Sequence, residues 1–133
     1  MKNLIKKILK ESEFDWLEDL SSQLKWHQDR HKKGYLNADD QRIGPWEYYY
    51  QNGNLLSKGE YLNGQRIGAW EFYYPNGNLS SKGEYLNDQK TGPWELYHYN
   101  GNLLAKGEYL NDQKTGPWEF YSRKGKLGYI VNY

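Results

Sequence analysis

Tryptophan recurs along this chain at a fixed interval of 24 residues, at Trp46, Trp70, Trp94 and Trp118. The first copy of the surrounding sequence starts at Gly44 and reads GPWEYYYQNGNLLSKGEYLN, and further copies begin at residues 68, 92 and 116. Self-similarity at a period of about 20 to 50 residues indicates a repeat architecture, in which each unit buries its apolar side on its neighbours. We therefore expect an array of stacked units.

An Asn-Gly dipeptide lies in the middle of each of the first three copies, at Asn52-Gly53, Asn76-Gly77 and Asn100-Gly101. A two-residue type I′ hairpin loop needs positive φ at both positions, which Asn and Gly tolerate best. Such a loop fixes the register of the first hairpin through four facing pairs: Trp46 and Gly59, Glu47 and Lys58, Tyr48 and Ser57, Tyr49 and Leu56. The same rule gives equivalent pairs in the next two copies.

Large rings face small residues on one side of the predicted sheet. Each tryptophan of a hairpin lies opposite a glycine, namely Gly59, Gly83 or Gly107. An indole laid across a strand glycine covers bare backbone and offsets the weakness of glycine in a strand. The other side carries facing Glu and Lys residues, which contribute at most about 1 kcal/mol per pair, and a row of tyrosines.

Both ends of the array depart from the repeat. Residues 32–43 resemble the second half of a copy with two residues inserted, and predict a leading strand near residues 33–37. In the last copy, Lys124-Gly125 replaces Asn-Gly, and Val131 falls opposite Trp118. Loss of the glycine is typical of a terminal unit that caps a stack. Nine strands follow, with two open edges through which two copies of the chain could pair.

Residues 1–31 have apolar residues at helical spacing, with Leu4, Ile5, Ile8 and Leu9 on one side and lysines around the other. Ser12 followed by Asp15 is typical of a helix start, so we expect two short helices or one helix broken near Ser12. This segment either covers the sheet as a cap or attaches to a membrane surface through its basic first part.

Composition favours neither nucleic acid nor acidic membranes as a partner. Lys and Arg total 18 against 17 Asp and Glu, which gives a net charge of +1, and there is no cysteine. No segment has the apolar length of a membrane span, and lysines interrupt the N-terminal apolar residues where a signal peptide would have an unbroken core. We expect a cytoplasmic protein.

The glutamates give no catalytic signal, because they recur with every copy while a catalytic pair occurs once in a singular pocket. The two rows are Glu47, Glu71, Glu95 and Glu119, and Glu60, Glu84 and Glu108. His27 and His31 would share one side of a helix as a metal pair, but no third ligand accompanies them at matching spacing. The sequence predicts no enzyme, no cofactor and no metal site.

The repeat G-x-W-E-x-Y-x-x-N-G-x-L-x-x-K-G-x-Y-x-N, carried from residues 44, 68 and 92, resembles the MORN-repeat variant of the bacterial YwqK-family antitoxins. The resemblance covers about residues 33–133. It implies a curved, single-layer antiparallel ribbon of hairpins that binds proteins and in some members phospholipid. It implies no catalysis, because enzymes of this superfamily carry a separate catalytic domain.

The sequence thus predicts a mainly β, single-layer antiparallel ribbon of stacked hairpins over residues 32–133, with a helical segment over residues 1–31. We expect a non-enzymatic, antitoxin-like or immunity-like module that binds a protein, or alternatively a membrane-surface scaffold. Hot spots of protein interfaces are rich in Trp and Tyr. The candidate partner residues are Tyr49, Tyr73, Tyr97 and Tyr121, and Trp46, Trp70 and Trp94, with Gly53, Gly59, Gly77, Gly83, Gly101 and Gly107 in structural roles. If the N-terminal helices cover the Trp side, only the tyrosine row is open.

Overall fold

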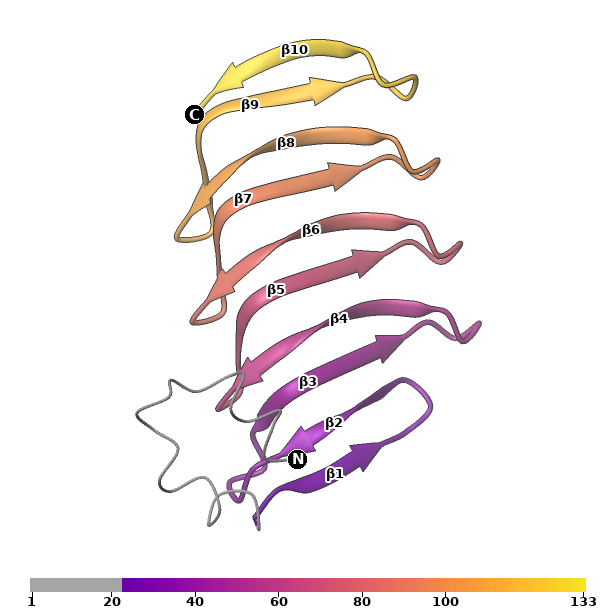
Figure 1. The fold of residues 1–133 in the computed structure, drawn as a ribbon, viewed down its shortest axis with the longest axis vertical. Helices are drawn as coiled ribbons and strands as arrows, with labels where there is room; N and C mark the ends of the chain where they lie inside the picture. Colours follow the sequence, from indigo (N-terminus) through magenta and orange to yellow (C-terminus); the bar gives the residue numbers. More distant parts are fainter. Residues whose placement is uncertain (1–22) are drawn as a thin grey trace.

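The computed structural model describes residues 23–133, which form one antiparallel sheet of ten strands in sequence order (Figure 1). The strands are β1 (Lys25–Gln28), β2 (Lys32–Leu36), β3 (Arg42–Tyr49), β4 (Leu55–Leu62), β5 (Gln65–Tyr73), β6 (Leu79–Leu86), β7 (Gln89–Tyr97), β8 (Leu103–Leu110), β9 (Gln113–Tyr121) and β10 (Leu127–Asn132). Each pairs only with its chain neighbours, so the hairpins stack like rungs and the ribbon is a single layer. The predicted ribbon architecture is confirmed.

The N-terminal end of the sheet differs from the prediction. The expected leading strand is present as β2, but residues 25–28, assigned to the helical segment, form the additional strand β1. β1 pairs with β2 through Trp26 opposite Tyr35 and His27 opposite Gly34. The Asp29 carboxylate accepts the backbone N–H groups of His31 and Lys32, which closes the turn between them. Residues 1–22 of the predicted helical segment, including the stretch around Ser12, lie outside the described residues.

The Asn-Gly loops are three residues long, so the predicted two-residue loop is wrong. The Gly53 N–H donates to the Tyr50 carbonyl at 3.0 Å and the Tyr50 N–H to the Asn54 carbonyl at 2.8 Å. Gly53 has φ of 89°, whereas Asn52 keeps a negative φ, as in a type I turn closed by a glycine in the left-handed region. An extra residue at Leu56 then restores the predicted pairing of Trp46 with Gly59, while Tyr49 faces Leu55.

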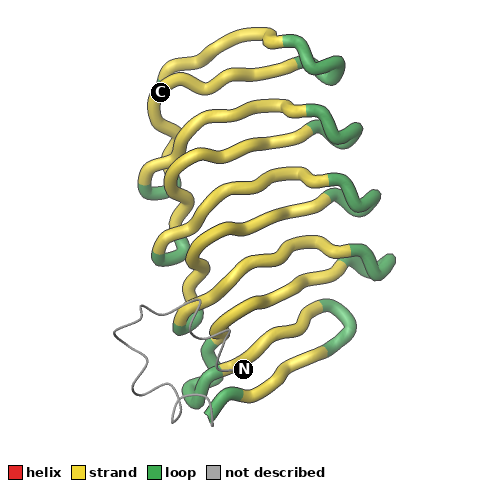
Figure 2. The backbone as a smooth tube through the Cα atoms, in the orientation of Figure 1, coloured by secondary structure: helices red, strands yellow, loops and turns green. Residues whose placement is uncertain are grey.

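Two-residue type I′ turns occur instead at the last three connections between hairpins, on the opposite side of the ribbon (Figure 2). Their residues both have positive φ: Asn63-Gly64 (49° and 85°), Asn87-Asp88 (49° and 68°) and Asn111-Asp112 (50° and 67°). Asn and Asp tolerate this region because their short polar side chains bond locally. These turns join each hairpin tightly to the next.

Each indole covers a glycine, but the glycine belongs to the preceding hairpin and not to the partner strand predicted. A Cβ at Gly59 would lie 2.1 Å from the Trp70 ring, and one at Gly83 would lie 2.1 Å from the Trp94 ring. Two extra residues, Gly68 and Ala69, interrupt the pairing of β5 with β4 at this point. The Trp70 Nε1–H then donates to the Glu60 carbonyl at 3.1 Å. Each tryptophan therefore fastens its own hairpin to the one before it.

Contacts between repeats also run forward from the hairpin loops. The Asn78 amide donates to the Tyr99 carbonyl at 3.0 Å and the Tyr74 hydroxyl to the Tyr97 carbonyl at 2.6 Å. The last copy lacks these donors, because Ser122 and Lys126 stand at the equivalent positions. Val131 lies opposite Trp118 as predicted. A side chain can occupy this position because, among the described residues, no later hairpin places an indole over it.

We predict that Gly83→Ala lowers the free energy of unfolding by about 3 kcal/mol, because the added methyl group overlaps the buried indole of Trp94. Denaturant unfolding followed by tryptophan fluorescence measures this loss. The control is Lys82→Ala, an exposed neighbour, which costs at most about 1 kcal/mol. Equal stability of the two variants would contradict the placement of the indole.

We also predict that Asn78→Ala lowers the unfolding free energy by about 1 kcal/mol, because the Tyr99 carbonyl loses an amide donor from the neighbouring loop. The matched control is Lys126→Ala, at the same position in the last copy. It should leave the denaturation midpoint unchanged. A comparable loss in both variants would show that the amide does not join the loops.

Candidate functional site

The tryptophan side of the sheet, here called the Trp face, holds the core of the ribbon. Trp46, Trp70, Trp94 and Trp118 are at most 2% exposed. Tyrosine rings meet them edge-on: the Tyr61 and Trp70 centroids are 5.1 Å apart at 86°, and those of Tyr85 and Trp94 are 5.3 Å apart at 88°. The predicted role of Trp46, Trp70 and Trp94 as partner contacts does not fit this burial. The tryptophan rings instead lie beneath the exposed side chains of the Trp face.

A row of cations lies over these rings, one at the start of each odd-numbered strand from β3. This cation row consists of Arg42, Arg66, Lys90 and Lys114. The Lys90 Nζ is 5.0 Å from the Trp94 centroid, and the Arg66 guanidinium is 4.1 Å from that of Tyr85. Cations over ring faces are attracted by the quadrupole of the ring. Sequence reasoning missed this row, although the 24-residue interval that places it is visible in the sequence.

The members of the cation row differ in their contacts with carboxylates. Arg66 pairs with Asp88 at 2.5 Å. Within residues 23–133, no ion pair involves Arg42, Lys90 or Lys114. The nearby Asp112 carboxylate accepts the backbone N–H of Lys90 at 2.8 Å. The Trp face therefore presents positive charge beside aromatic surface.

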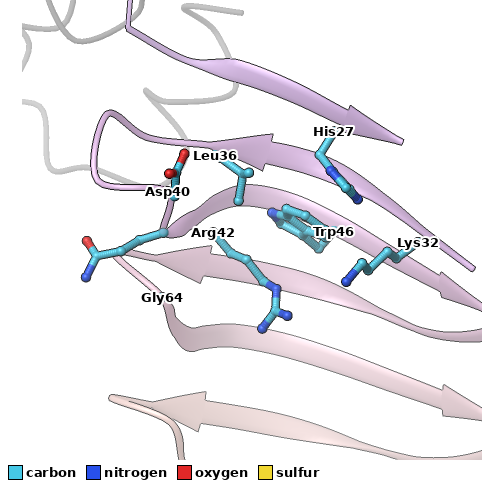
Figure 3. Close-up of a pocket in the computed structure, with 8 residues that line it drawn as sticks. His27, Lys32, Leu36, Asp40, Arg42, Trp46 and Gly64 are labelled. Atoms are coloured by element: carbon cyan, nitrogen blue, oxygen red, sulfur yellow. The ribbon is translucent and has the colours of Figure 1, made fainter. Parts of the chain in front are cut away.

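A hollow lies at the N-terminal end of the Trp face, where the side chains of His27, Lys32 and Arg42 surround Trp46 (Figure 3). The His27 ring stacks on Trp46 at 6.0 Å and contacts the Asp29 carboxylate at 3.2 Å. His27 thus lies in strand β1, and it does not form the helical metal pair with His31 that the sequence suggested. In the described part of the chain, no cluster of three or more His, Asp or Glu residues could hold a metal ion.

The opposite side, here called the Tyr face, carries the predicted tyrosine row. Each tyrosine donates its hydroxyl to the glutamate two residues before it: Tyr49 to Glu47, Tyr73 to Glu71, Tyr97 to Glu95 and Tyr121 to Glu119. The four tyrosines are partly exposed and form one line along the array. The structure therefore brings them together and leaves their ring surfaces available.

Lysines of the Tyr face pair with the glutamate of the next repeat, not with that of their own hairpin as the sequence analysis assumed. Lys33 pairs with Glu47 at 3.2 Å, and the equivalent pairs are Lys58–Glu71 (3.8 Å), Lys82–Glu95 (3.6 Å) and Lys106–Glu119 (3.5 Å). Each central glutamate faces a lysine on both neighbouring strands, so the predicted register is right. The closer contact lies across the repeat boundary.

The hydrogen bonds between tyrosines and glutamates shift the pKa values of both groups on the Tyr face. Partial burial and the hydrogen bond to Glu71 raise the pKa of Tyr73 to about 12, and Glu95 has the same effect on Tyr97. The hydroxyl of Tyr49 lowers the pKa of Glu47, and Lys33 adds to the effect. These groups keep the charge of the row fixed at neutral pH.

Shallow hollows recur on the Tyr face at each repeat boundary. Their linings are equivalent: Pro45, Glu47, Lys58 and Glu60; then Ala69, Glu71, Lys82 and Glu84; then Pro93, Glu95, Lys106 and Glu108. The hollows therefore repeat the same chemistry three times, with a lysine beside glutamates in each.

Three segments, residues 42–63, 66–87 and 90–111, match the family described as MORN repeat variant, and each covers one hairpin. The chain carries MORN-type repeats. No curated protein matches the chain. One similar solved structure is described as the Glycosylation Associate Protein (Gap123) complex from Streptococcus agalactiae, with 16% identity and a TM-score of 0.44. The similarity covers 87% of this chain but 21% of that one, so this chain spans about a fifth of its length.

MORN repeats are commonly modules that bind proteins or membranes. In residues 23–133, no helix is long and apolar enough to cross a membrane. The MORN-type hairpins of this chain place two surfaces back to back. One is the Trp face with its cation row, and the other is the Tyr face with its Glu and Lys ladder.

We predict that wild-type protein loses stability between pH 10 and pH 12 more steeply than a Tyr73→Phe, Tyr97→Phe variant. Folding raises the pKa of both phenols from about 10 to about 12, so their contribution is complete below pH 10 and disappears as the pH rises through 12. Spectrophotometric titration of phenolate should lose part of its late phase in this variant. An unchanged late phase would contradict the hydrogen bonds to Glu71 and Glu95.

Proposed function

We propose that this chain is a non-enzymatic binding module that recognises another protein through a face of its repeat ribbon. The observation that supports it is that the tyrosine row, the Glu and Lys ladder and the cation row all recur with the repeat, on both faces. Solenoid arrays use such extended surfaces to bind partners. The tyrosine row, the two arginines of the cation row and the half-buried aromatic rings are residue types enriched in binding hot spots.

An antitoxin-like or immunity-like role in the cytoplasm is part of the same proposal. The resemblance of the repeat to the YwqK group supports the role. The near-balanced charge and the lack of cysteine are compatible with a reducing compartment. A partner of this kind would be a protein whose activity is blocked when the ribbon binds it.

Membrane association is the second candidate, and the cation row on the Trp face is the observation that favours it. Anionic lipid headgroups are attracted to clustered Lys and Arg near an aromatic surface. The net charge of +1 argues against strong general attraction, because the glutamates of the Tyr face balance the cations. Vesicle binding separates this candidate from the first.

We predict that one of two face variants loses protein capture from native-host extract by about tenfold or more while the other keeps it. The Tyr-face variant is Tyr49→Ala, Tyr73→Ala, Tyr97→Ala, and the Trp-face variant is Lys90→Glu, Lys114→Glu. The loop variant Lys124→Glu, Lys126→Glu is the control for charge. Retention of near-ultraviolet circular dichroism establishes that each variant stays folded.

Two outcomes would count against the proposal. Equal capture by wild type and both face variants would overturn recognition through the ribbon. Binding to vesicles of phosphatidylcholine and phosphatidylserine, without capture of any protein, would favour the membrane candidate instead.

A further inference from the structure

The Trp face carries two adjacent rows that differ in chemistry. One is the cation row, and the other is an apolar row of half-buried side chains, Tyr48, Phe72, Leu96 and Phe120. The Lys114 Nζ is 5.0 Å from the Trp118 centroid and 5.7 Å from that of Phe120, so the rows lie side by side. A complementary partner must present carboxylates directly beside apolar side chains.

The spacing of the cation row indicates the backbone conformation of that partner. Neighbouring strands lie about 4.8 Å apart and each repeat has two, so successive cations are about 10 Å apart. Residues i and i+7 of an α-helix share one side and are separated by about 10.5 Å. An extended strand covers about 10 Å in three residues, but an odd spacing places consecutive carboxylates on opposite sides. A helix therefore matches the row and a strand does not.

The charges of the Tyr face direct an acidic partner away from it. All four of its lysines, Lys33, Lys58, Lys82 and Lys106, already pair with glutamates. Glu60, Glu84 and Glu108 add carboxylates without a lysine in ion-pair contact within the described residues. On the Trp face, in contrast, the side chains of Arg42, Lys90 and Lys114 make no ion pair among residues 23–133. Repulsion on one face and attraction on the other give specificity for the Trp face.

We propose that the Trp face is the docking surface for an acidic, amphipathic helix of a partner protein that lies along the array. Carboxylates at heptad spacing contact Lys90, Lys114 and Arg42, and the adjoining apolar stripe packs on Phe72, Leu96 and Phe120. The buried tryptophans hold both rows in place, which keeps the surface preorganised. This inference rests on the proposed function and names the face and the chemistry of the partner.

The test uses a synthetic helical peptide with Glu at every seventh position and leucines on the adjoining stripe, and a shuffled peptide of the same composition. Titration calorimetry with the full chain should detect the first peptide and not the second. Lys90→Glu, Lys114→Glu should weaken binding by about tenfold or more, since two attractions become repulsions. Lys90→Gln, Lys114→Gln matches the Glu variant in size but is neutral, so it should weaken binding less.

The control variant Lys124→Glu, Lys126→Glu changes the net charge equally but lies in an exposed loop, and should bind like wild type. Tryptophan fluorescence establishes that the Trp face is intact in each variant. Added salt should weaken binding to wild type more steeply than binding to the Gln variant.

Several results would overturn the inference. These are equal affinity for the shuffled peptide, equal loss in the loop control, and binding to phosphatidylserine vesicles in place of the peptide. Peptide binding that appears only after neutralisation of Glu11, Glu13, Asp15, Glu18 and Asp19 would assign the surface to the chain's own acidic stretch. If the Tyr-face variant alone loses the native partner, the inference fails while the proposed function stands.

Discussion

The stacking of an indole over the glycine of the preceding hairpin is the contact on which this structure depends. A single-layer sheet has no second layer to bury its apolar side, so each tryptophan must find cover within the sheet itself. The flat backbone at Gly59, Gly83 and Gly107 provides room that any side chain would fill. Edge-on tyrosines and overlying cations complete the burial, which reaches 98% or more for all four rings. The contact between indole and glycine thus both buries the rings and joins each hairpin to the one before it.

That contact also explains the chemistry of the two faces. Because the rings are buried between neighbouring hairpins, the outermost groups of the Trp face are the cations and the half-buried apolar side chains. On the Tyr face, the same stacking brings each lysine beside the glutamate of the next repeat. Among residues 23–133, the lysines of the Tyr face are therefore paired with glutamates, whereas most side chains of the cation row make no ion pair. The two faces of the sheet therefore differ in their charge pairing because of the stacking of the hairpins alone.

Repeat length, strand pairing and the capping of the last copy could be predicted because they depend on local periodicity and on facing residue types. The loop geometry could not be predicted, because Asn52-Gly53 suits both a two-residue and a three-residue turn. The extra residue at Leu56 restores the same pairing beyond the loop, so the pairing does not distinguish the two turns. The glycine covered by each tryptophan depends on the two-residue interruption at Gly68-Ala69, which periodicity does not specify. Strand β1 was missed because Trp26 follows Leu17, Leu20 and Leu24, whose spacing is typical of a helix. The 24-residue spacing of the cation row can be read from the sequence, but its contact with the aromatic rings cannot, because it depends on where those rings lie.

The bonds between repeats run in both directions, from each indole back to the preceding hairpin and from each Asn-Gly loop forward to the next. The copy at residues 116–133 lacks the forward donors. Each internal copy therefore carries the residues that bond it to both of its neighbours. Duplication of an internal copy would extend both faces by one increment of about 10 Å, with every new junction already encoded in the duplicated residues. The reach of the ribbon is thus a property that evolution or design can adjust in whole steps, independently of how the chain terminates.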